Sequence, residues 1–492
     1  MAGTIAKNVG LLTAANLLMR GVGMLFQVYL TGQVGAAGVG LLQLIVTVQL
    51  FAMTLGTSGL RVAALYLSAE EYGLRRFSGV RQAISWCLGA GLVLSALVGA
   101  ALAALAEPAA RLWVQDLRAV TSLRLLGLTL PLNCLSGILA GCYTACGQVR
   151  RLVAVEVGDK LATVGITAAL LRQGVAGDLA HACAAIVAGN ALAAVGSVAV
   201  LAAMGLRWLN RLPQTPPAPD MGRRLGRVAV PVALNDYLRS GLGTVEQFLI
   251  PRGLTRHGGS QGRAMADYGT IHGMVFPLLM FPSTVLLAVA DVLVPELARR
   301  RAEKNQARIE WVVERCLTLG LLYAGLVAGF LHLLARPMGQ LIYGSADAGR
   351  YLRLFAPVVV MLYLDLIVDG LHKGLGQQVY CVRVNTFTSL LDVAMLFFLL
   401  PQWGLAGYYV SFLVSHGVNF YLSLRRLVRV SGVRLAPLGV CRALLPGAAA
   451  AMVSALALPA AATLPQTLVT GGFYLALAAL LLPAGKPFHV GG

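Results

Sequence analysis

The chain has 492 residues, of which 58% are hydrophobic and only 12% are charged, and its formal net charge is +19. A soluble domain is typically about 25% charged, so this composition excludes an ordinary soluble protein and predicts an integral membrane protein. A basic excess of this size would suggest nucleic-acid binding in a soluble chain. Here the basic residues are distributed among loops, where they would face anionic lipid headgroups, so membrane lipids and not nucleic acid are the expected partners.

Long charge-free stretches follow one another along the chain, and several, such as Gln82 to Ala106, contain the roughly 20 apolar residues that cross a bilayer. Backbone polar groups must be satisfied within each such segment, which predicts an all-α fold. Hydropathy predicts about fourteen transmembrane helices. In chain order they are 9–30, 40–60, 83–106, 123–145, 152–171, 180–205, 227–250, 268–294, 312–335, 351–372, 380–400, 404–424, 438–458 and 466–483.

Lysine and arginine are concentrated in alternate loops, while the loops between them hold far fewer. The positive-inside rule therefore predicts that both termini are cytoplasmic. The basic loops include Arg75, Arg76 and Arg81; Arg150 and Arg151; Arg207, Arg211, Arg223 and Arg224; and Arg299, Arg300 and Arg301.

The eight cysteines lie in or at the ends of predicted spans and form no C-x-x-C pair. They are expected to be small buried hydrophobic residues, and we predict no metal site and no cofactor.

A short internal repeat links the first predicted span to the seventh. Residues 16–23 read N-x-x-x-R-G-x-G, residues 235–243 read N-x-x-x-R-S-G-x-G, and the Pro-rich segment 212–220 lies between the two halves. Two pseudo-symmetric six-helix lobes around a central cavity, followed by two additional helices, are therefore predicted. The expected divisions are 1–211 for the first lobe, 212–224 for a cytoplasmic linker, 225–430 for the second lobe and 431–492 for the last two helices.

Arg20 is the most informative single residue, because it lies near the middle of the first span. An arginine at the centre of a membrane span costs roughly 2.5–3.5 kcal/mol on insertion scales, so such residues usually face a polar interior and have a function. No acidic residue lies within one helical turn of Arg20. A partner on another helix or an anionic ligand is therefore expected.

The seventh span carries three ionisable residues, Asp236, Arg239 and Glu246, on one helical face. Such a face is not expected to contact lipid. Arg61 ends the second span and Asp291 ends the eighth, and both are predicted to belong to the same cavity.

Several of these charges have a structural interpretation as well. Arg61 lies near a predicted membrane boundary, where it can extend its guanidinium to water, and Asp236 can pair with Arg239 on its own helix. Glu156 and Lys160 form an i,i+4 pair that is expected to neutralise itself.

The tenth span holds Asp365 and Asp369, two acids one turn apart. They would repel each other if both were ionised, and Lys373 one turn further along would relieve that repulsion.

Parts of the sequence resemble the oligosaccharide flippases of the multidrug/oligosaccharidyl-lipid/polysaccharide exporter superfamily, in particular the stage V sporulation protein B group, which is related to the peptidoglycan-precursor flippase MurJ. The resemblance covers about 430 residues in order. It rests on GAAGVGLLQL (35–44), LGTSGLRVAALYLSAE (55–70), LRLLGLTLPLNCLSGILAGCYTACGQ (123–148), the FPS and LVPELA elements of 281–298, and ARPMGQLIYG (335–344).

This resemblance implies a bacterial cell-membrane protein that moves an undecaprenyl-pyrophosphate-linked oligosaccharide or peptidoglycan precursor between leaflets. It also implies that Arg20 and Arg61 contact the pyrophosphate. MurJ-like members carry an additional arginine shortly before the proline of span 8, whereas VFPLLMF around Pro282 has no cation. Sporulation-type members are similar to this chain at that point, so the identity of the saccharide stays open.

A pyrophosphate needs permanently charged donors in the cavity, and arginine offers planar bidentate ones. Arg239 is therefore expected to join Arg20 and Arg61 in substrate binding. Movement of one lobe against the other would give alternating access, driven by a coupling ion (H⁺ or Na⁺) or by the membrane potential. Asp236, Glu246 and Asp291 are the candidates to respond to that ion.

Three other functions would share parts of this pattern. A cation or drug antiporter of the same superfamily would place acidic groups in the first lobe, and Arg20 argues against that. A membrane enzyme would need a catalytic region outside the bilayer, and the longest external loop, near 251–267, leaves little room for one. A non-transporting assembly protein of cell-wall or spore-cortex formation would keep the same lobes and remains an alternative.

Overall fold

The computed structural model describes residues 2–173, 178–216, 220–433, 437–458 and 463–481, and within these ranges all regular secondary structure is helical. The described side chains begin at residue 18. The prediction of an all-α protein is confirmed for this part of the chain.

The chain divides into two compact units, which are considered separately below. Residues 1–26 and 33–248 form the first unit, and residues 27–32 and 249–492 form the second. The lobe boundary at 212–224, suggested by the Pro-rich linker, stays a prediction. Within the linker, Thr215 exchanges two hydrogen bonds with Ser78 of the first unit, from Ser78 N to Thr215 Oγ1 (2.9 Å) and from Thr215 N to Ser78 Oγ (3.0 Å).

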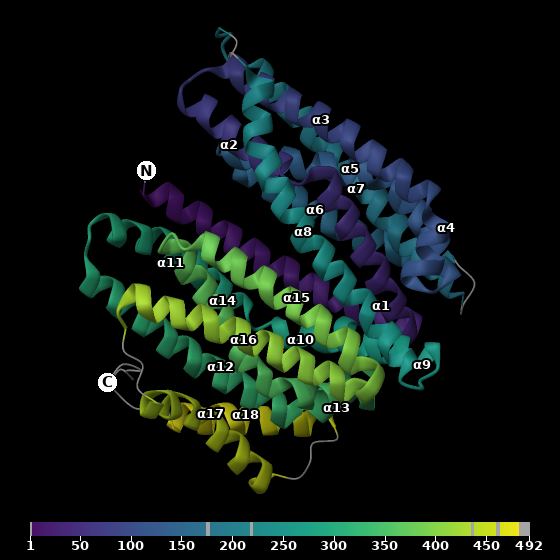
Figure 1. Ribbon diagram of the computed structural model, residues 1–492, viewed down its shortest axis with the longest axis vertical. Coiled ribbons are helices and arrows are strands. Elements are labelled where there is room, and N and C mark those ends of the chain that lie inside the picture. The colour runs from purple at the N-terminus through teal and green to yellow at the C-terminus, as the bar shows by residue number, and fades with distance from the viewer. Residues whose placement is uncertain (1, 174–177, 217–219, 434–436, 459–462, 482–492) are drawn as a thin grey trace. The chain divides into compact units, whose positions relative to one another are not determined.

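The first unit is built around α5, which packs on α2, α3 and α7, while α6 packs on α7 (Figure 1). The elements in this part of the chain are α1 (Ala2–Thr57), α2 (Leu60–Gly73), α3 (Phe77–Ala104), α4 (Ala106–Ala109), η1 (Ala110–Val114), η2 (Leu117–Ala119), α5 (Val120–Ala145), α6 (Val149–Gln173), α7 (Leu179–Asn210) and α8 (Met221–Arg256), whose last residues belong to the second unit.

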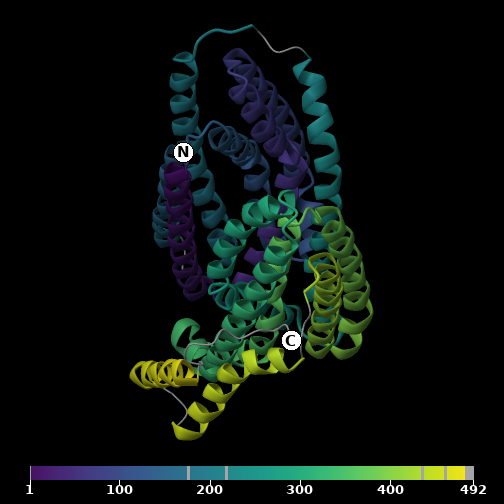
Figure 2. The same ribbon diagram turned by 90° about the vertical axis from the view of Figure 1, so that its left-hand side faces the viewer.

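The second unit is built around α12, which packs on α13, α14, α17 and α18, while α15 and α16 lie side by side (Figures 1 and 2). Its elements are α9 (Gln261–Gly269), η3 (Thr270–Val275), α10 (Phe276–Met280), α11 (Thr284–Ala302), α12 (Gln306–Tyr343), α13 (Ala346–Phe355), η4 (Ala356–Val358), α14 (Val359–Gly374), α15 (Gln378–Trp403), α16 (Leu405–Ser431), α17 (Pro437–Ala457) and α18 (Leu464–Leu481).

Each predicted span corresponds to helical structure, but not to a separate straight helix. The first two spans run together in α1, which breaks only at Gly35, where φ is 68°. The eighth span is two helical segments, Gln261–Met280 and Thr284–Ala302, bent by 56°. Among the described residues, eight helices are long and apolar enough to cross a membrane, or nine with the bent pair, so the total of fourteen stays a prediction.

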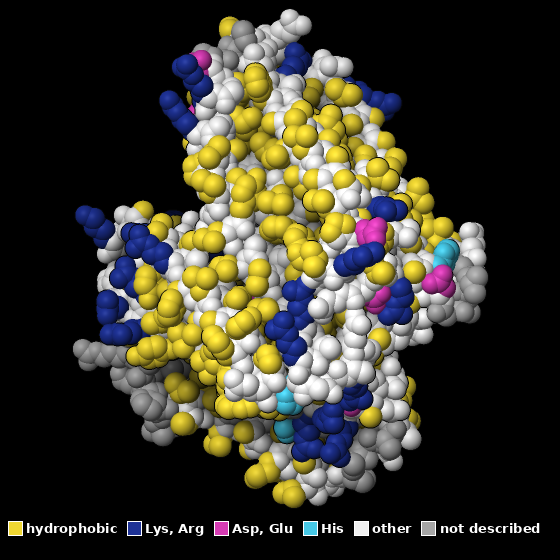
Figure 3. All heavy atoms as spheres, turned by 45° about the vertical axis from the view of Figure 1, so that its right-hand side comes forward, with side chains coloured by type: hydrophobic (Ala, Val, Ile, Leu, Met, Phe, Trp, Pro, Cys, Tyr) yellow, Lys and Arg dark blue, Asp and Glu magenta, His cyan; other side chains and the backbone are white. Residues whose placement is uncertain are grey.

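The surface is rich in exposed hydrophobic side chains, as expected where lipid replaces water (Figure 3). Together with the long apolar helices, this surface supports a multi-pass membrane protein.

The start of α2 is fixed by one glycine. Gly59 has a φ of 76°, a left-handed conformation that favours glycine, and a Cβ there would collide with the carbonyl of Ala229 in α8. The turn at Ser58 and Gly59 therefore brings the end of α1 and the start of α2 directly against α8. This contact places Arg61, two residues later, beside α8.

An ion-pair cluster holds the end of α2 against the start of α8. Arg224, near the start of α8, donates to Glu71 Oε1 (2.6 Å) and Glu70 Oε2 (2.9 Å) at the end of α2. The Glu71 side chain is fully buried, and Gly79 leaves the space that its carboxylate occupies. Losing Arg224 would leave a buried charge unpaired, which is strongly destabilising.

Close backbone contact joins α3 to α5. A Cβ on Gly127 of α5 would lie 2.5 Å from the Gly99 carbonyl oxygen and 2.9 Å from Ala103 N, both in α3. Small residues at such crossings let helix backbones approach, which is the usual basis of helix association in membranes.

We expect Gly127→Ala to destabilise the protein by about 1–3 kcal/mol, because the added methyl group overpacks the crossing. Gly137→Ala on the same helix is the matched control, since a Cβ there meets nothing within 4 Å. Alanine is favoured over glycine in a helix by about 1 kcal/mol, so the control is expected to be neutral or stabilising. Unfolding midpoints in detergent measure both variants, and equal midpoints would contradict the close-packing argument.

Candidate functional site

The first unit contains a polar pocket of about 510 Å³ between the end of α1, the start of α2 and α8. It contains two arginines, one aspartate and several hydroxyl groups. Its lining residues are Leu50, Met53, Thr54, Thr57, Ser58, Gly59, Arg61, Val62, Asp236, Arg239 and Ser240. The structure thus brings three of the six predicted site residues into one pocket.

Hydrogen bonds beside the pocket join α8 to the end of α1 and the turn that follows it. Ser58 Oγ donates to Asp236 Oδ2 at 2.6 Å, and Tyr237 Oη donates to the Leu55 carbonyl at 3.1 Å. Asn235 Nδ2 donates to Asp236 Oδ1 at 3.5 Å. Asp236 therefore holds two helices together, a role that the proposed pairing with Arg239 did not foresee.

Arg61 and Arg239 give the pocket an excess of positive charge. Both side chains are exposed to the open pocket, whereas Asp236 is half-buried and receives the Ser58 hydroxyl. Guanidinium groups present planar, paired donors that match phosphate and carboxylate oxygens. The pocket is therefore suited to an anion with several oxygen atoms.

Helix α6 carries one charged residue, Glu156, that acts on the pocket residue Arg61, and another, Lys160, that approaches α1. The Glu156 carboxylate lies close enough to Arg61 for their charges to interact, and Lys160 reaches to within 3.9 Å of the Cβ position of Gly23 in α1. Asp159, beside Lys160, accepts a hydrogen bond from Ser197 Oγ at 2.6 Å. The charged residues of α6 thus interact with Arg61 of α2 and Ser197 of α7 and approach Gly23 of α1, which the sequence spacing alone did not indicate.

The other three predicted site residues do not line the polar pocket. Arg20 is an exposed residue of α1 in the first unit, one turn before Gly23. Glu246 is half-buried in α8, and the side chain of Asp291 lies outside the described residues. Their assignment to substrate or ion remains a prediction.

Acidic residues in the second unit show what the sequence analysis missed. Asp392 in α15 is buried and accepts a hydrogen bond from Ser411 Oγ of α16 at 2.9 Å. The sequence signal that could have identified Asp392 is a single acid within the apolar run TSLLDVAMLFF.

The predicted relief of the repulsion between Asp365 and Asp369 is confirmed, since Lys373 Nζ lies 2.7 Å from Asp369 Oδ2.

An apolar groove adjoins the polar pocket. It has a volume of about 740 Å³ and lies among the start of α2, α3 and α8. Small residues, Gly89 and Ala90 of α3 and Ala229 and Ala233 of α8, contribute to its lining, and Ser58 lines both the groove and the polar pocket. A cationic pocket thus borders a hydrocarbon-lined groove within one unit.

These features define a class: a multi-pass helical membrane protein with a cationic pocket beside an apolar groove. Within the described residues, no group of three or more His, Cys, Asp or Glu side chains could hold a metal ion. Residues 5–301 match the family described as polysaccharide biosynthesis protein, and the chain belongs to that family.

Similar proteins are found among both sequences and structures. The chain is 21% identical to stage V sporulation protein B of Bacillus subtilis (strain 168) over 412 residues, which cover 82% of this chain and 80% of the relative. The fold matches lipid II flippase MurJ in an inward closed conformation with a TM-score of 0.68 at 12% identity, covering 96% of this chain and 98% of MurJ.

An inward-facing multidrug resistance MATE family transporter of the MOP superfamily matches with a TM-score of 0.63 at 16% identity, covering 84% of this chain and 96% of the transporter. At these identities the two structures show only that the chain shares their fold. The resemblance inferred from sequence motifs is confirmed by the family match together with the sequence relative.

We expect Ser58→Ala to destabilise the first unit by about 1.5 kcal/mol or more, because the mutation removes a hydrogen bond to a charged group. Ser240→Ala, in the same pocket, is the control, and Ser58→Thr keeps the donor. Thermal unfolding in detergent distinguishes them. Equal losses for Ser58→Ala and Ser240→Ala would show that the Asp236 contact contributes nothing specific.

Proposed function

We propose that the protein translocates an undecaprenyl-pyrophosphate type lipid-linked oligosaccharide or peptidoglycan precursor across the cytoplasmic membrane of a bacterium. The observation that carries this proposal is the adjacency of the polar pocket, with Arg61 and Arg239, to the apolar groove. A lipid-linked saccharide has a charged pyrophosphate between a long hydrocarbon chain and a sugar. The polar pocket would hold the pyrophosphate, and the apolar groove would hold the adjoining end of the hydrocarbon chain. Ser58 lies at the junction of the two sites.

The pyrophosphate is the part of the substrate that the membrane opposes most strongly, because an ion in hydrocarbon loses its hydration. Arg61 and Arg239 would replace water around the phosphate oxygens, and Arg20 would contact the headgroup elsewhere on its path. The groove would keep the first part of the lipid chain in an apolar environment during that passage.

The relatives support this choice. Stage V sporulation protein B and lipid II flippase MurJ are the named relatives, and the family description refers to polysaccharide biosynthesis. The multidrug transporter shares the fold, but a cationic drug would meet two guanidiniums beside one carboxylate in the polar pocket. Like charges disfavour such a ligand, so the antiporter alternative is the weaker one.

Translocation requires alternating access and an energy source, which we assign to a coupling ion, H⁺ or Na⁺, or to the membrane potential. Asp236, Glu246 and Asp291 are proposed to respond to that ion. Asp392 joins them because its carboxylate is buried and accepts a hydrogen bond from the Ser411 hydroxyl. Both termini are proposed to be cytoplasmic, as the distribution of basic loops indicates.

We expect Arg61→Ala and Arg239→Ala each to lower translocation of a fluorescent lipid-linked pyrophosphate saccharide by roughly tenfold or more, equivalent to one charge-assisted hydrogen bond. Arg61→Lys is expected to be intermediate, since it keeps charge and loses the paired donors. Vesicles containing purified protein, assayed with and without an imposed potential, provide the measurement.

Arg111→Ala is the matched control for these arginine variants, because Arg111 is exposed and pairs with Glu107 outside the polar pocket. Normal translocation by both pocket variants in correctly inserted protein would remove the pyrophosphate role. A loss equal to that of Arg111→Ala would show a general effect of charge and not a binding site. Wild-type protein that moves no lipid-linked saccharide at all would instead favour the assembly-protein alternative.

We expect Ala90→Phe, which fills the apolar groove, to reduce translocation of a long-chain substrate at least tenfold and to leave a short-chain analogue much less affected. Ala96→Phe, exposed on the same helix and outside the groove, is the control. The ratio of long-chain to short-chain rates is the measurement. An unchanged ratio would show that the groove does not hold the lipid chain.

A further inference from the structure

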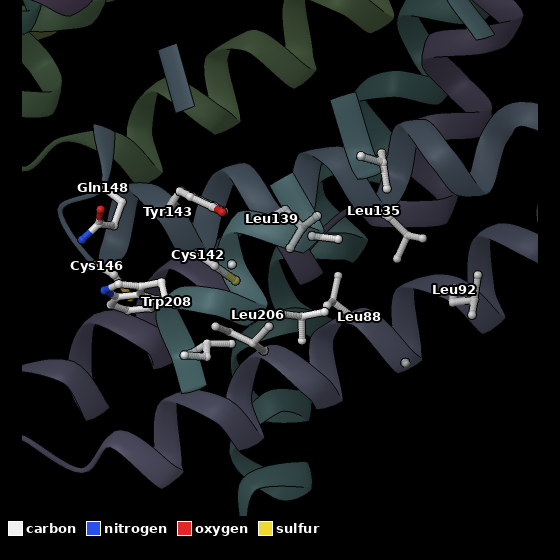
Figure 4. A pocket seen from close by; sticks show the side chains of 16 residues that line it. Leu88, Leu92, Leu135, Leu139, Cys142, Tyr143, Cys146, Gln148, Leu206 and Trp208 are labelled. Carbon is white, nitrogen blue, oxygen red and sulfur yellow. The ribbon is translucent and has the colours of Figure 1, made fainter. Parts of the chain in front are cut away.

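Two features of the molecule take no part in the proposed translocation. The first is an apolar cavity of about 370 Å³ among α3, α5 and α7, whose lining side chains Figure 4 shows. That lining carries no charged side chain, so it contains no group that would recognise a particular ligand. The second feature, the α12–α13 site, does contain such groups. It consists of His332 and Arg336 of α12 and Arg353 of α13.

The α12–α13 site is created by a close helix crossing in the second unit. A Cβ on Gly339 of α12 would collide with Gly349 N, and a Cβ on Gly349 of α13 would lie 2.9 Å from Arg336 Cα. Glycine at both positions therefore lets the two backbones meet. His332 lies one turn before Arg336 on α12, and Arg353 lies one turn after Gly349 on α13. The crossing thus places Arg336 beside α13 and Arg353 beside α12.

His332 holds the guanidinium of Arg353 in place. Arg353 Nε donates to His332 Nε2 at 3.4 Å, and His332 Nδ1 lies 3.2 Å from the Arg353 carbonyl oxygen. A guanidinium only donates and a carbonyl only accepts, so in this arrangement the imidazole is neutral and carries its proton on Nδ1. Within the described part of the chain, the Nη groups of Arg353 donate to no other residue. These groups are therefore available to an oxygen anion from outside the protein.

Among the described residues, no carboxylate pairs with either arginine of the α12–α13 site. Two acids lie in the neighbouring network of α9 and α13, but both are already used. Asp267 pairs with Arg263 at 3.3 Å, and Asp347 is shared by Arg263 (3.4 Å) and Arg350 (3.2 Å). The α12–α13 site therefore keeps an excess of positive charge.

The site also lies where the membrane surface is expected. It is close to the end of the candidate span Gln306–Tyr343 and to the start of the candidate span Ala346–Gly374. Leu354, next to Arg353, is exposed, as expected of a residue that faces lipid. Basic side chains gather beside histidine near the bottom of the view in Figure 3. With both termini cytoplasmic, as proposed above, this end of α12 is external, a side on which lysine and arginine are normally few. Positive charge placed there against the usual distribution indicates an anionic ligand.

From this geometry we infer that the α12–α13 site binds the phosphate group of an anionic phospholipid in the outer leaflet. The guanidiniums of Arg336 and Arg353 offer planar donors to the phosphate oxygens, while the exposed apolar surface at Leu354 meets the acyl chains. A headgroup with a net negative charge is preferred over phosphatidylcholine, because the same guanidiniums repel the choline cation. The site shares no residue with the polar pocket, and the inference is independent of the transported cargo.

Photo-crosslinking in vesicles that contain the full-length protein tests this site. Phosphatidylglycerol and phosphatidylcholine, each with a photoreactive group beside the phosphate, are compared, and mass spectrometry locates the label. Phosphatidylglycerol is expected to label α12 and α13 around the site at least tenfold more than phosphatidylcholine does. The double variant Arg336→Gln, Arg353→Gln is expected to lose that difference. Arg350→Gln is the matched control, because Arg350 is exposed on the same helix and pairs with Asp347, and it is expected to be labelled like wild type.

His332→Ala keeps both charges and removes only the acceptor for Arg353 Nε, so it remains informative if the double variant does not insert. It is expected to reduce phosphatidylglycerol labelling several-fold. Equal labelling by the two lipids, or unchanged labelling in the double variant, would overturn the inference. Suppression of labelling by excess inorganic phosphate would overturn it in favour of a site for free anions. Displacement by polyprenyl pyrophosphate at equal concentration would overturn it in favour of a release site for the proposed cargo.

Discussion

A half-buried carboxylate on a helix needs a hydrogen-bond donor, and in this protein Ser58 supplies one to Asp236 across 178 positions of sequence. That contact brings the end of α1 to α8, and the left-handed turn at Gly59 makes the approach sterically possible. The buried Glu71 and its partner Arg224 hold the end of α2 to the start of α8. The polar pocket exists because these polar contacts are satisfied between helices and not within one.

The arrangement of polar and apolar surfaces follows from the same helices. One side of the turn at Ser58 presents Arg61 and Arg239, while the groove beyond it is lined largely by small and apolar residues. Small residues such as Ala90 and Ala233 leave space because their side chains do not fill the gap between α3 and α8. The amphiphilic ligand that we propose would fit such a boundary, since either surface alone would leave half of the molecule in an unfavourable environment.

The sequence predicted the helical class, the approximate helices and the pocket residues Arg61, Asp236 and Arg239, because hydropathy and charges in apolar spans are local signals. It did not predict that the first two spans form one helix broken only at Gly35, since a single left-handed glycine replaces the expected loop. Nor did spacing identify Ser58 as the partner of Asp236, because that contact depends on how distant helices pack. Arg20 shows the same limit: its sequence position indicated function, but not which residues surround it.

The charge balance of the pocket also bears on turnover. A transporter must bind its cargo strongly enough to admit it and weakly enough to release it. Arg61 interacts with Glu156 as well as facing the pocket, and both pocket guanidiniums are exposed, so water screens their attraction for an anion. A fully buried pair of arginines would bind pyrophosphate more tightly and release it more slowly. Partial neutralisation by a neighbouring helix would therefore favour release of the anionic headgroup that we propose as cargo.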